Sequence, residues 1–213
     1  MQDLKLIWEE ALGKYSNQKT LHTQLWSEIV EAYNSPSRYY HNLVHIHTMI
    51  TLAGKHKDSI ENIQAFYLAI FYHDIVYDAS RSDNELQSWI YAENHLKNIP
   101  IPPNEMTLIR IYILATKSHE LHDNKDVNLL LDLDLFTLGK SWNDYLNYTE
   151  EIRQEYSIYP DKLYYNGRFN VLTHFLNSGN IFKTKVFYDA FETQARLNLT
   201  TERDYLQSKI NEL

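Results

Sequence analysis

The spacing of its apolar residues constrains the fold of this 213-residue chain more than any other feature. Apolar side chains recur mostly at steps of three and four residues, the period of an α-helix, and no segment shows the sustained alternation expected of a β-strand. Only five glycines and five prolines are present to interrupt helices. The pattern therefore predicts an all-α protein, folded as a single domain.

The periodicity predicts ten helices, and several of their ends have physical reasons. Pro36 ends the second helix, and a proline-rich break precedes the sixth. Ser82 and Glu85 have the spacing of a capping box, Asp126 is a candidate cap for the apolar run after it, and Gly139 ends that run. The predicted helices span residues 3–15, 20–34, 41–56, 60–78, 83–97, 104–118, 126–139, 141–157, 160–178 and 183–211.

Composition argues against several classes of function. The chain has no cysteine, so thiolate nucleophiles and sulfur-ligated zinc are excluded, and any metal must be held by histidine and carboxylate. A net charge of −8 argues against an extended nucleic-acid partner, which would require a basic surface. No segment approaches the roughly 20 apolar residues of a membrane span, and the N-terminus lacks the pattern of a signal peptide. We therefore expect a cytoplasmic protein with no membrane partner.

One His-Asp pair, His73 and Asp74, lies inside the apolar segment AIFYHDIVYD, residues 69–78. Because burying a carboxylate without a partner is costly, we expect a metal ion or a basic side chain to compensate it. A second pair, His122 and Asp123, lies in a polar segment, where a solvated surface pair is expected. The sequence context therefore favours His73 and Asp74 as site residues.

Histidines and aspartates also cluster in two other segments. YYHNLVHIHTM, residues 39–49, contains His41 and His45 one helical turn apart on one face, whereas His47 points elsewhere. In LLLDLDLFTLG, Asp132 and Asp134 point to different sides of a helix, so at least one should turn inward. These segments supply further candidate ligands.

Together, His45, His73, Asp74 and Asp134 make a set of two imidazoles and two carboxylates. Nitrogen and oxygen ligands of this kind suit a divalent ion of Mn, Fe, Co, Ni, Zn or Mg. In order and spacing the four residues resemble the motif of the HD-domain superfamily of metal-dependent phosphohydrolases, which has a histidine, a His-Asp pair and a distant aspartate, all on helices. The resemblance implies that these four residues are the metal ligands.

More narrowly, the chain is similar to a bacterial family of predicted HD-superfamily phosphohydrolases of about this length. The similar segments cover residues 38–198 and read YYHNLVHI, FYHDIVYD, NELQS, LATKSHE, LDLDLFTLG, IRQEY, GRFNVL and FETQARLNL. The resemblance implies an HD-type helical domain over residues 1–213. Its core would span about 36–140, with additional N-terminal helices and with C-terminal helices, 141–213, packed on it.

The segment YHNLVHI also resembles the Tyr-His-Asn-x-x-His stretch of cyclic-nucleotide phosphodiesterases. In those enzymes the second histidine binds metal and the first protonates the leaving group. The resemblance therefore makes His45 a ligand and His41 a candidate general acid, and leaves His47 outside the site. No purine-binding glutamine and aromatic segment of those enzymes is recognisable here, so a cyclic nucleotide is not implied.

The implied reaction is hydrolysis of a phosphate ester or anhydride by a metal-activated water. His41 or Glu85 would protonate the leaving oxygen, with helix capping as the structural alternative for Glu85. Arg38, Lys117 and His119 lie in the family-like segments and are expected to contact substrate phosphate.

Several other polar residues carry structural expectations. Asp78 is expected to support a ligand or to lie at the surface, and Arg153 and Arg196 lie among acidic residues that favour ion pairs. His174 is expected in the core, and the histidines expected at the surface are His22, His56 and His95.

The sequence thus predicts a metal-dependent phosphohydrolase acting on a nucleotide or another small phosphorylated metabolite. Two alternatives stay open. One is a non-catalytic, metal-containing module that binds or senses a nucleotide, and the other is a di-iron HD-type oxygenase, which would need further ligands. A monomer and a homodimer are both compatible with the sequence.

Overall fold

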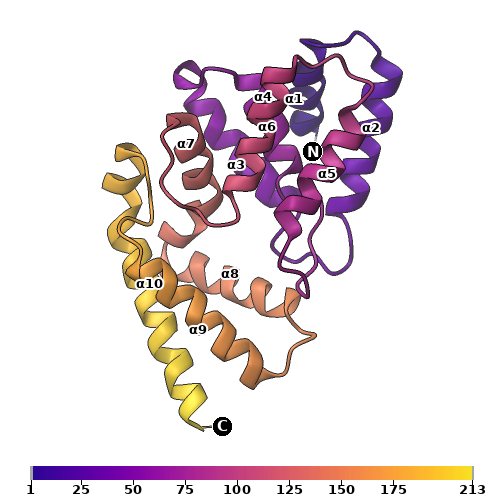
Figure 1. Cartoon of the computed structure of the whole chain (residues 1–213). Coiled ribbons are helices and arrows are strands. Elements are labelled where there is room, and N and C mark those ends of the chain that lie inside the picture. The colour runs from indigo at the N-terminus through magenta and orange to yellow at the C-terminus, as the bar shows by residue number, and fades with distance from the viewer. Residues whose placement is uncertain (1, 213) are drawn as a thin grey trace. The chain divides into compact units, whose positions relative to one another are not determined.

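The computed structural model describes residues 2–212, which form ten α-helices, two short 3-10 helices and no strand (Figure 1). The predicted all-α class is confirmed. By their backbone contacts the residues cluster into two compact units, Met1–Leu133 and Asp134–Leu213. The elements are α1 (Gln2–Gly13), α2 (Lys19–Tyr33), α3 (Leu43–Lys55), η1 (Lys57–Ser59), α4 (Ile63–Tyr72), α5 (Asn84–Leu96), α6 (Pro103–Ala115), α7 (Lys125–Asp134), η2 (Leu135–Gly139), α8 (Trp142–Glu155), α9 (Asp161–Asn177) and α10 (Lys185–Glu212).

Two of the helix ends differ from the sequence prediction at positions that matter for the site. The third helix begins at Leu43 because Asn42 caps it, its side-chain oxygen accepting a hydrogen bond from the backbone N–H of Val44 at 2.8 Å. His41 therefore precedes the helix. The fourth helix, predicted to reach residue 78, ends at Tyr72, with His73 as its C-cap.

Two predicted caps are also wrong. Ser82 does not cap α5, because the helix starts at Asn84 with Asp83 as its N-cap. Asp126 does not cap α7, since the side chain of Asn124 accepts the backbone N–H of Asp126 at 2.8 Å. The carboxylate of Asp126 is buried instead and accepts the backbone N–H of Glu61 at 2.8 Å.

Helix α4 is the central element of the first unit, where it packs against α1, α3, α5 and α6 (Figure 1). Every residue from Ala65 to Tyr72 is buried, so α4 has no solvent-facing stripe over its last two turns. Trp8 of α1 meets the edge of Phe71 with ring centroids 5.4 Å apart. This packing fixes the end of α4, and with it the position of His73.

A chain of hydrogen bonds joins α2, α4 and α5 beside this core. The hydroxyl of the fully buried Tyr72 lies 2.7 Å from Nδ1 of His95, whose Nε2 lies 2.8 Å from a carboxylate oxygen of Glu28. Because Glu28 can only accept, Nε2 donates to it, and Nδ1 of the neutral ring accepts from Tyr72. Burial lowers the pKa of His95 below its ordinary value, although Glu28 acts in the opposite direction.

The lowered pKa of His95 predicts a loss of stability in mild acid. As pH falls below about 6.5, the unfolded chain takes up a proton at His95 before the folded chain does, so the free energy of unfolding falls. In His95→Gln this contribution is removed, so the decrease in stability between about pH 7.5 and 5.5 should be smaller than in the wild type.

Urea unfolding at a series of pH values, with a chelator present throughout, measures this difference. His174→Gln is the matched control, because it makes the same substitution at an exposed histidine of α9. The prediction would be contradicted if the free energy of unfolding of His95→Gln fell with pH as steeply as that of the wild type.

Three histidines lie where the sequence did not predict them. His22 is 4% exposed and the side chain of His95 is 8% exposed, whereas both were expected at the surface. His174, expected in the core, is exposed on α9. A histidine suits either environment, and only the packing of the neighbouring helices decides between them.

The second unit contains α8, α9 and α10, drawn in orange to yellow in Figure 1, and its longest helix, α10, packs against α9 and η2. Arg168 of α9 pairs with both carboxylate oxygens of Glu202 at 2.9 and 3.0 Å, and both side chains are less than a tenth exposed. The hydroxyl of Tyr145 also donates to Glu202. Arg196 pairs with Glu192 of its own helix at 2.8 Å, as expected from the acids that flank it. Arg153 of α8 pairs with Asp161 at the start of α9 at 2.7 Å, which the acids flanking it did not predict.

Gly139 ends η2 for a reason that the sequence does not reveal. Its backbone is not left-handed, so no turn requires a glycine there. A Cβ at this position would lie 2.6 Å from Cβ of Phe191 and 3.1 Å from the carbonyl oxygen of Phe191, both on α10. The glycine is therefore required by the close approach of two backbones.

Gly139→Ala should lower the free energy of unfolding by about 1 to 3 kcal/mol, because the helix backbone that meets the new methyl group cannot move away cheaply. Gly167→Ala is the matched control: it lies within α9 with nothing within 4 Å of an added Cβ, and should raise stability by about 0.5 to 1 kcal/mol. Chemical denaturation of both variants measures the two changes. Equal effects of the two substitutions would contradict this account of Gly139.

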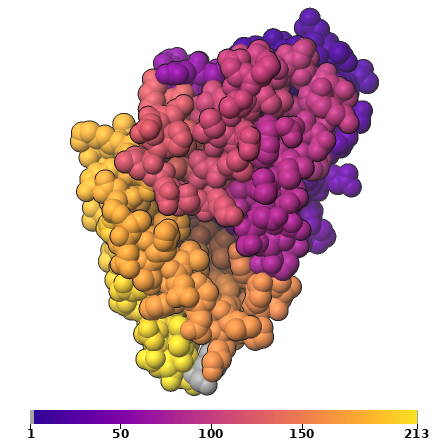
Figure 2. Space-filling view, viewed as in Figure 1, coloured from indigo at the N-terminus to yellow at the C-terminus, as the bar shows by residue number. Residues whose placement is uncertain are grey.

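The surface of the first unit visible in Figure 2 is formed largely by magenta and rose residues of the segment from α5 to α7. Among the helices described, none combines the length and the apolar character needed to span a membrane.

Candidate metal centre

Two histidines from different helices form the floor of the candidate site. His45 lies in the first turn of α3 and is 6% exposed, and His73 caps α4 and is fully buried. Their Nε2 atoms face each other at 3.3 Å. The packing of α3 against α4 brings them together across 28 residues of sequence.

Two aspartates complete the group. Asp74 follows His73 directly, and Asp134 is the last residue of the continuous helix α7, so the register of that helix determines where it points. One ligand atom from each of His45, His73, Asp74 and Asp134 lies within 4.8 Å of the other three. The structure therefore brings together the four residues that the sequence singled out as metal ligands.

The donor set fits a metal ion in both geometry and chemistry. At bond lengths of about 2.1 Å and angles of about 90 to 110°, two ligand atoms of one ion lie about 3.0 to 3.4 Å apart. The Nε2 atoms of His45 and His73 are 3.3 Å apart, and Nε2 of His73 lies 3.1 Å from Oδ2 of Asp74. Nitrogen and carboxylate ligands suit the divalent ions expected from the sequence.

The ring of His73 is oriented for ligation by a backbone carbonyl. Its Nδ1 lies 2.9 Å from the carbonyl oxygen of Ile70, which can only accept, so Nδ1 carries the proton and Nε2 is left with its lone pair. The last turn of a helix has carbonyls without intrahelical partners, and Ile70 is three residues before His73. That spacing is a signal from which the contact could have been predicted.

His41 lies beside this group rather than within it. Its Nε2 is 3.9 Å from Oδ2 of Asp74, and its ring stacks on Tyr77 with centroids 4.0 Å apart. The side chain is 17% exposed, against 0% for His73, so it lies toward the solvent side of the group. Tyr77, which the sequence distinguished only by its proximity to the site, fixes the plane of this imidazole.

Arg38 connects His41 to Asp74 through the backbone. Its Nη1 donates to the carbonyl oxygens of His41 at 3.0 Å and Asp74 at 2.6 Å, and its Nη2 donates to that of Ile75 at 2.7 Å. The guanidinium also lies over the ring of Tyr33, 4.9 Å from its centroid. These contacts indicate a positioning role, and a direct contact between Arg38 and substrate stays a prediction.

The other predicted site residues are not members of the group of four. Lys117 is exposed just beyond the end of α6, and His119 is half-buried in a left-handed backbone conformation, with φ of 51°. Glu85 is half-buried in the first turn of α5. Their contact with substrate, and the choice between Glu85 and His41 as proton donor, stay predictions.

The remaining aspartates of the two motifs have separate roles. Asp78 is exposed and accepts hydrogen bonds from the backbone N–H and hydroxyl of Ser80, which lower its pKa. It therefore shapes the turn after α4. Asp132 is fully buried on α7, two residues before Asp134, which agrees with the expectation that at least one of this pair turns inward.

Replacing Asp74 should abolish most metal binding, because the site loses a charged ligand beside two buried imidazoles. Titration of the full-length protein with Mn²⁺ by calorimetry should show that Asp74→Ala binds at least about a hundredfold more weakly than the wild type. Asp78→Ala, which removes a carboxylate four residues away at the exposed turn, should bind as the wild type does. Equal affinities of wild type and Asp74→Ala would exclude this group as the metal site.

Comparison of the chain with models of protein families, with curated proteins and with solved structures finds no match.

Proposed function

We propose that this protein is a metal-dependent phosphohydrolase that cleaves a phosphate ester or anhydride of a nucleotide or another small phosphorylated metabolite. The observation that carries the proposal is the group of two histidines and two aspartates, whose ligand atoms gather within 4.8 Å next to His41. The motif resemblance to the HD-domain superfamily gives the reaction class.

A divalent cation held by the group would act as a Lewis acid, lowering the pKa of a water molecule and withdrawing charge from phosphoryl oxygens. His45 and His73 would supply neutral nitrogen ligands, and Asp74 and Asp134 would balance the ionic charge. Of the four, Asp74 and Asp134 are the more exposed, so substrate would approach from their side.

His41 is suited to proton transfer by its position and its support. An imidazole titrates near neutral pH, and this ring lies next to the ligand Asp74 on the more exposed side. Stacking on Tyr77 and the bond from Arg38 to the His41 carbonyl restrict its movement. His41 would therefore hold a proton near the leaving oxygen of a bound substrate.

A screen for released phosphate tests the proposal. Full-length protein loaded with Mn²⁺ is incubated with nucleoside mono-, di- and triphosphates and with sugar phosphates, and turnover is expected on at least one class. Asp74→Ala serves as the inactive control. Metal binding without turnover on any of these compounds would overturn the hydrolase proposal in favour of a metal-containing binding or sensing module.

His41→Ala should retain metal and lose about 10²- to 10⁴-fold in turnover, because it removes a proton donor but no ligand. Turnover and Mn²⁺ affinity are measured on the same preparation. His174→Ala, a change at an exposed histidine of α9, is the matched control and should leave both unchanged. Full activity in His41→Ala together with inactivity of Glu85→Gln would transfer the acid role to Glu85.

A further inference from the structure

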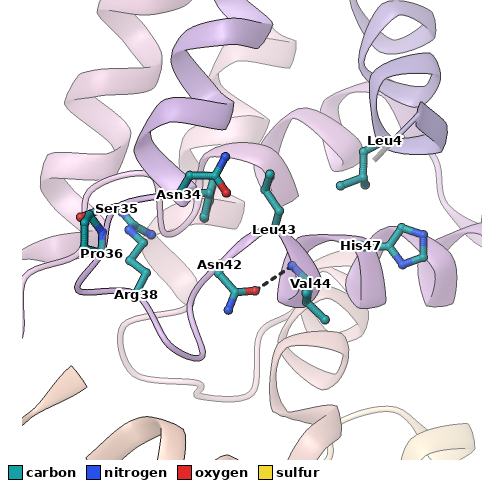
Figure 3. Close-up of a pocket in the computed structure, with 10 residues that line it drawn as sticks. Leu4, Asn34, Ser35, Pro36, Arg38, Asn42, Leu43, Val44 and His47 are labelled. Atoms are coloured by element: carbon teal, nitrogen blue, oxygen red, sulfur yellow. Dashed lines mark hydrogen bonds between the residues drawn. The ribbon is translucent and has the colours of Figure 1, made fainter. Parts of the chain in front are cut away.

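A groove of about 590 Å³ opens in the first unit beside the N-terminal half of α3 (Figure 3). One wall comes from the C-terminal end of α2 and the following loop, including Asn34, Ser35 and Arg38. The other wall comes from α3, where Leu43, Val44 and His47 share a stripe that differs from the face of His45. The groove is therefore a separate concavity from the metal centre.

The lining of the groove differs in charge from the protein as a whole. The chain carries 28 acidic residues and a net charge of −8, yet none of the described residues that line the groove is acidic. The basic side chains among these described residues are Arg38 and His47. Three of the five N–H groups of Arg38 bind backbone carbonyls, which leaves two for a ligand. This lining favours an anion.

The groove also offers an apolar surface. Leu43 and Tyr33 are buried, while Val44 is 73% exposed and shares the solvent-facing side of α3 with the exposed His47. The amide of Asn34 and the hydroxyl of Ser35 add hydrogen-bonding groups at the rim. The volume falls within the range of about 300 to 1,000 Å³ found for small-molecule sites. A ligand with a charged end and an apolar or aromatic body matches these features.

We propose that this groove binds a small organic phosphate, of the size of a nucleoside monophosphate, at a site distinct from the metal centre. Arg38 would contact the phosphoryl group, Leu43 and Val44 would contact the body of the ligand, and His47 would lie at the opposite end of the groove from Arg38 (Figure 3). The three histidines at residues 41–47 would then have three different roles. His45 would be a metal ligand, His41 a proton donor, and His47 a lining residue of the groove.

Arg38 connects the groove to the metal centre through its hydrogen bonds. Arg38 lines the groove, and its guanidinium holds the carbonyls of His41 and Asp74, so a ligand bound to Arg38 would compete with or reinforce those bonds. A ligand in the groove would then regulate the metal centre. This regulation rests on the proposed function, whereas binding of the ligand to the groove does not rest on it.

Calorimetric titration of the full-length protein, in the presence of a chelator, tests binding without metal or turnover. Saturable 1:1 binding of AMP is expected, and it should be tighter than binding of inorganic phosphate, because phosphate lacks an apolar body. His47→Glu should weaken AMP binding at least tenfold by placing a carboxylate at the groove. Val44→Trp, which fills the groove at an exposed position, should weaken it as well.

His174→Glu is the matched control, because it makes the same change at an exposed histidine of α9 and should leave AMP binding unchanged. Asp74→Ala should also retain AMP binding. No saturable binding of AMP, AMP binding no tighter than phosphate, or unaltered affinity in His47→Glu would each overturn the groove proposal. Loss of AMP binding in Asp74→Ala with retention in His47→Glu would place the nucleotide at the metal centre, which would overturn the groove site while supporting the proposed function.

Discussion

The complete burial of α4 over its last two turns is the constraint on which the candidate site depends. A helix with no solvent-facing stripe must be surrounded, and α1, α3, α5 and α6 surround it. The C-terminal end of α4 therefore positions His73 and Asp74 where water cannot fully satisfy their hydrogen-bonding groups. An imidazole and a carboxylate in that position require partners, and His45 and Asp134 are the groups that meet them.

The site is supported by backbone carbonyls as much as by side chains. Ile70 orients the ring of His73, and the guanidinium of Arg38 holds the carbonyls of His41, Asp74 and Ile75. A carbonyl at a helix end or in a turn has no regular partner, so these positions are natural acceptors for a cation or a ring N–H. Because Arg38 also lines the groove beside α3, one residue belongs to two candidate sites.

The two candidate sites have opposite charge character. The metal centre places two carboxylates beside two imidazoles, a set suited to a cation. The groove has a guanidinium and an imidazole among described lining residues that include no acid, a set suited to an anion. Helix α3 contributes residues to both candidate sites, since residue 45 lies on a different face of the helix from residues 43, 44 and 47.

The sequence by itself determined the helical class and nearly all of the helices, because periodicity of apolar residues is a local property. It also singled out His45, His73, Asp74 and Asp134, because their types are those of metal ligands and their order resembles a known motif. Helix ends were less well determined where a cap decides them, as at Asn42, which leaves His41 outside α3. Only the tertiary structure decided that His41 stacks on Tyr77, that Arg38 binds carbonyls, and that Gly139 is required by Phe191. Each of these depends on contacts between segments distant in sequence, which no local pattern specifies.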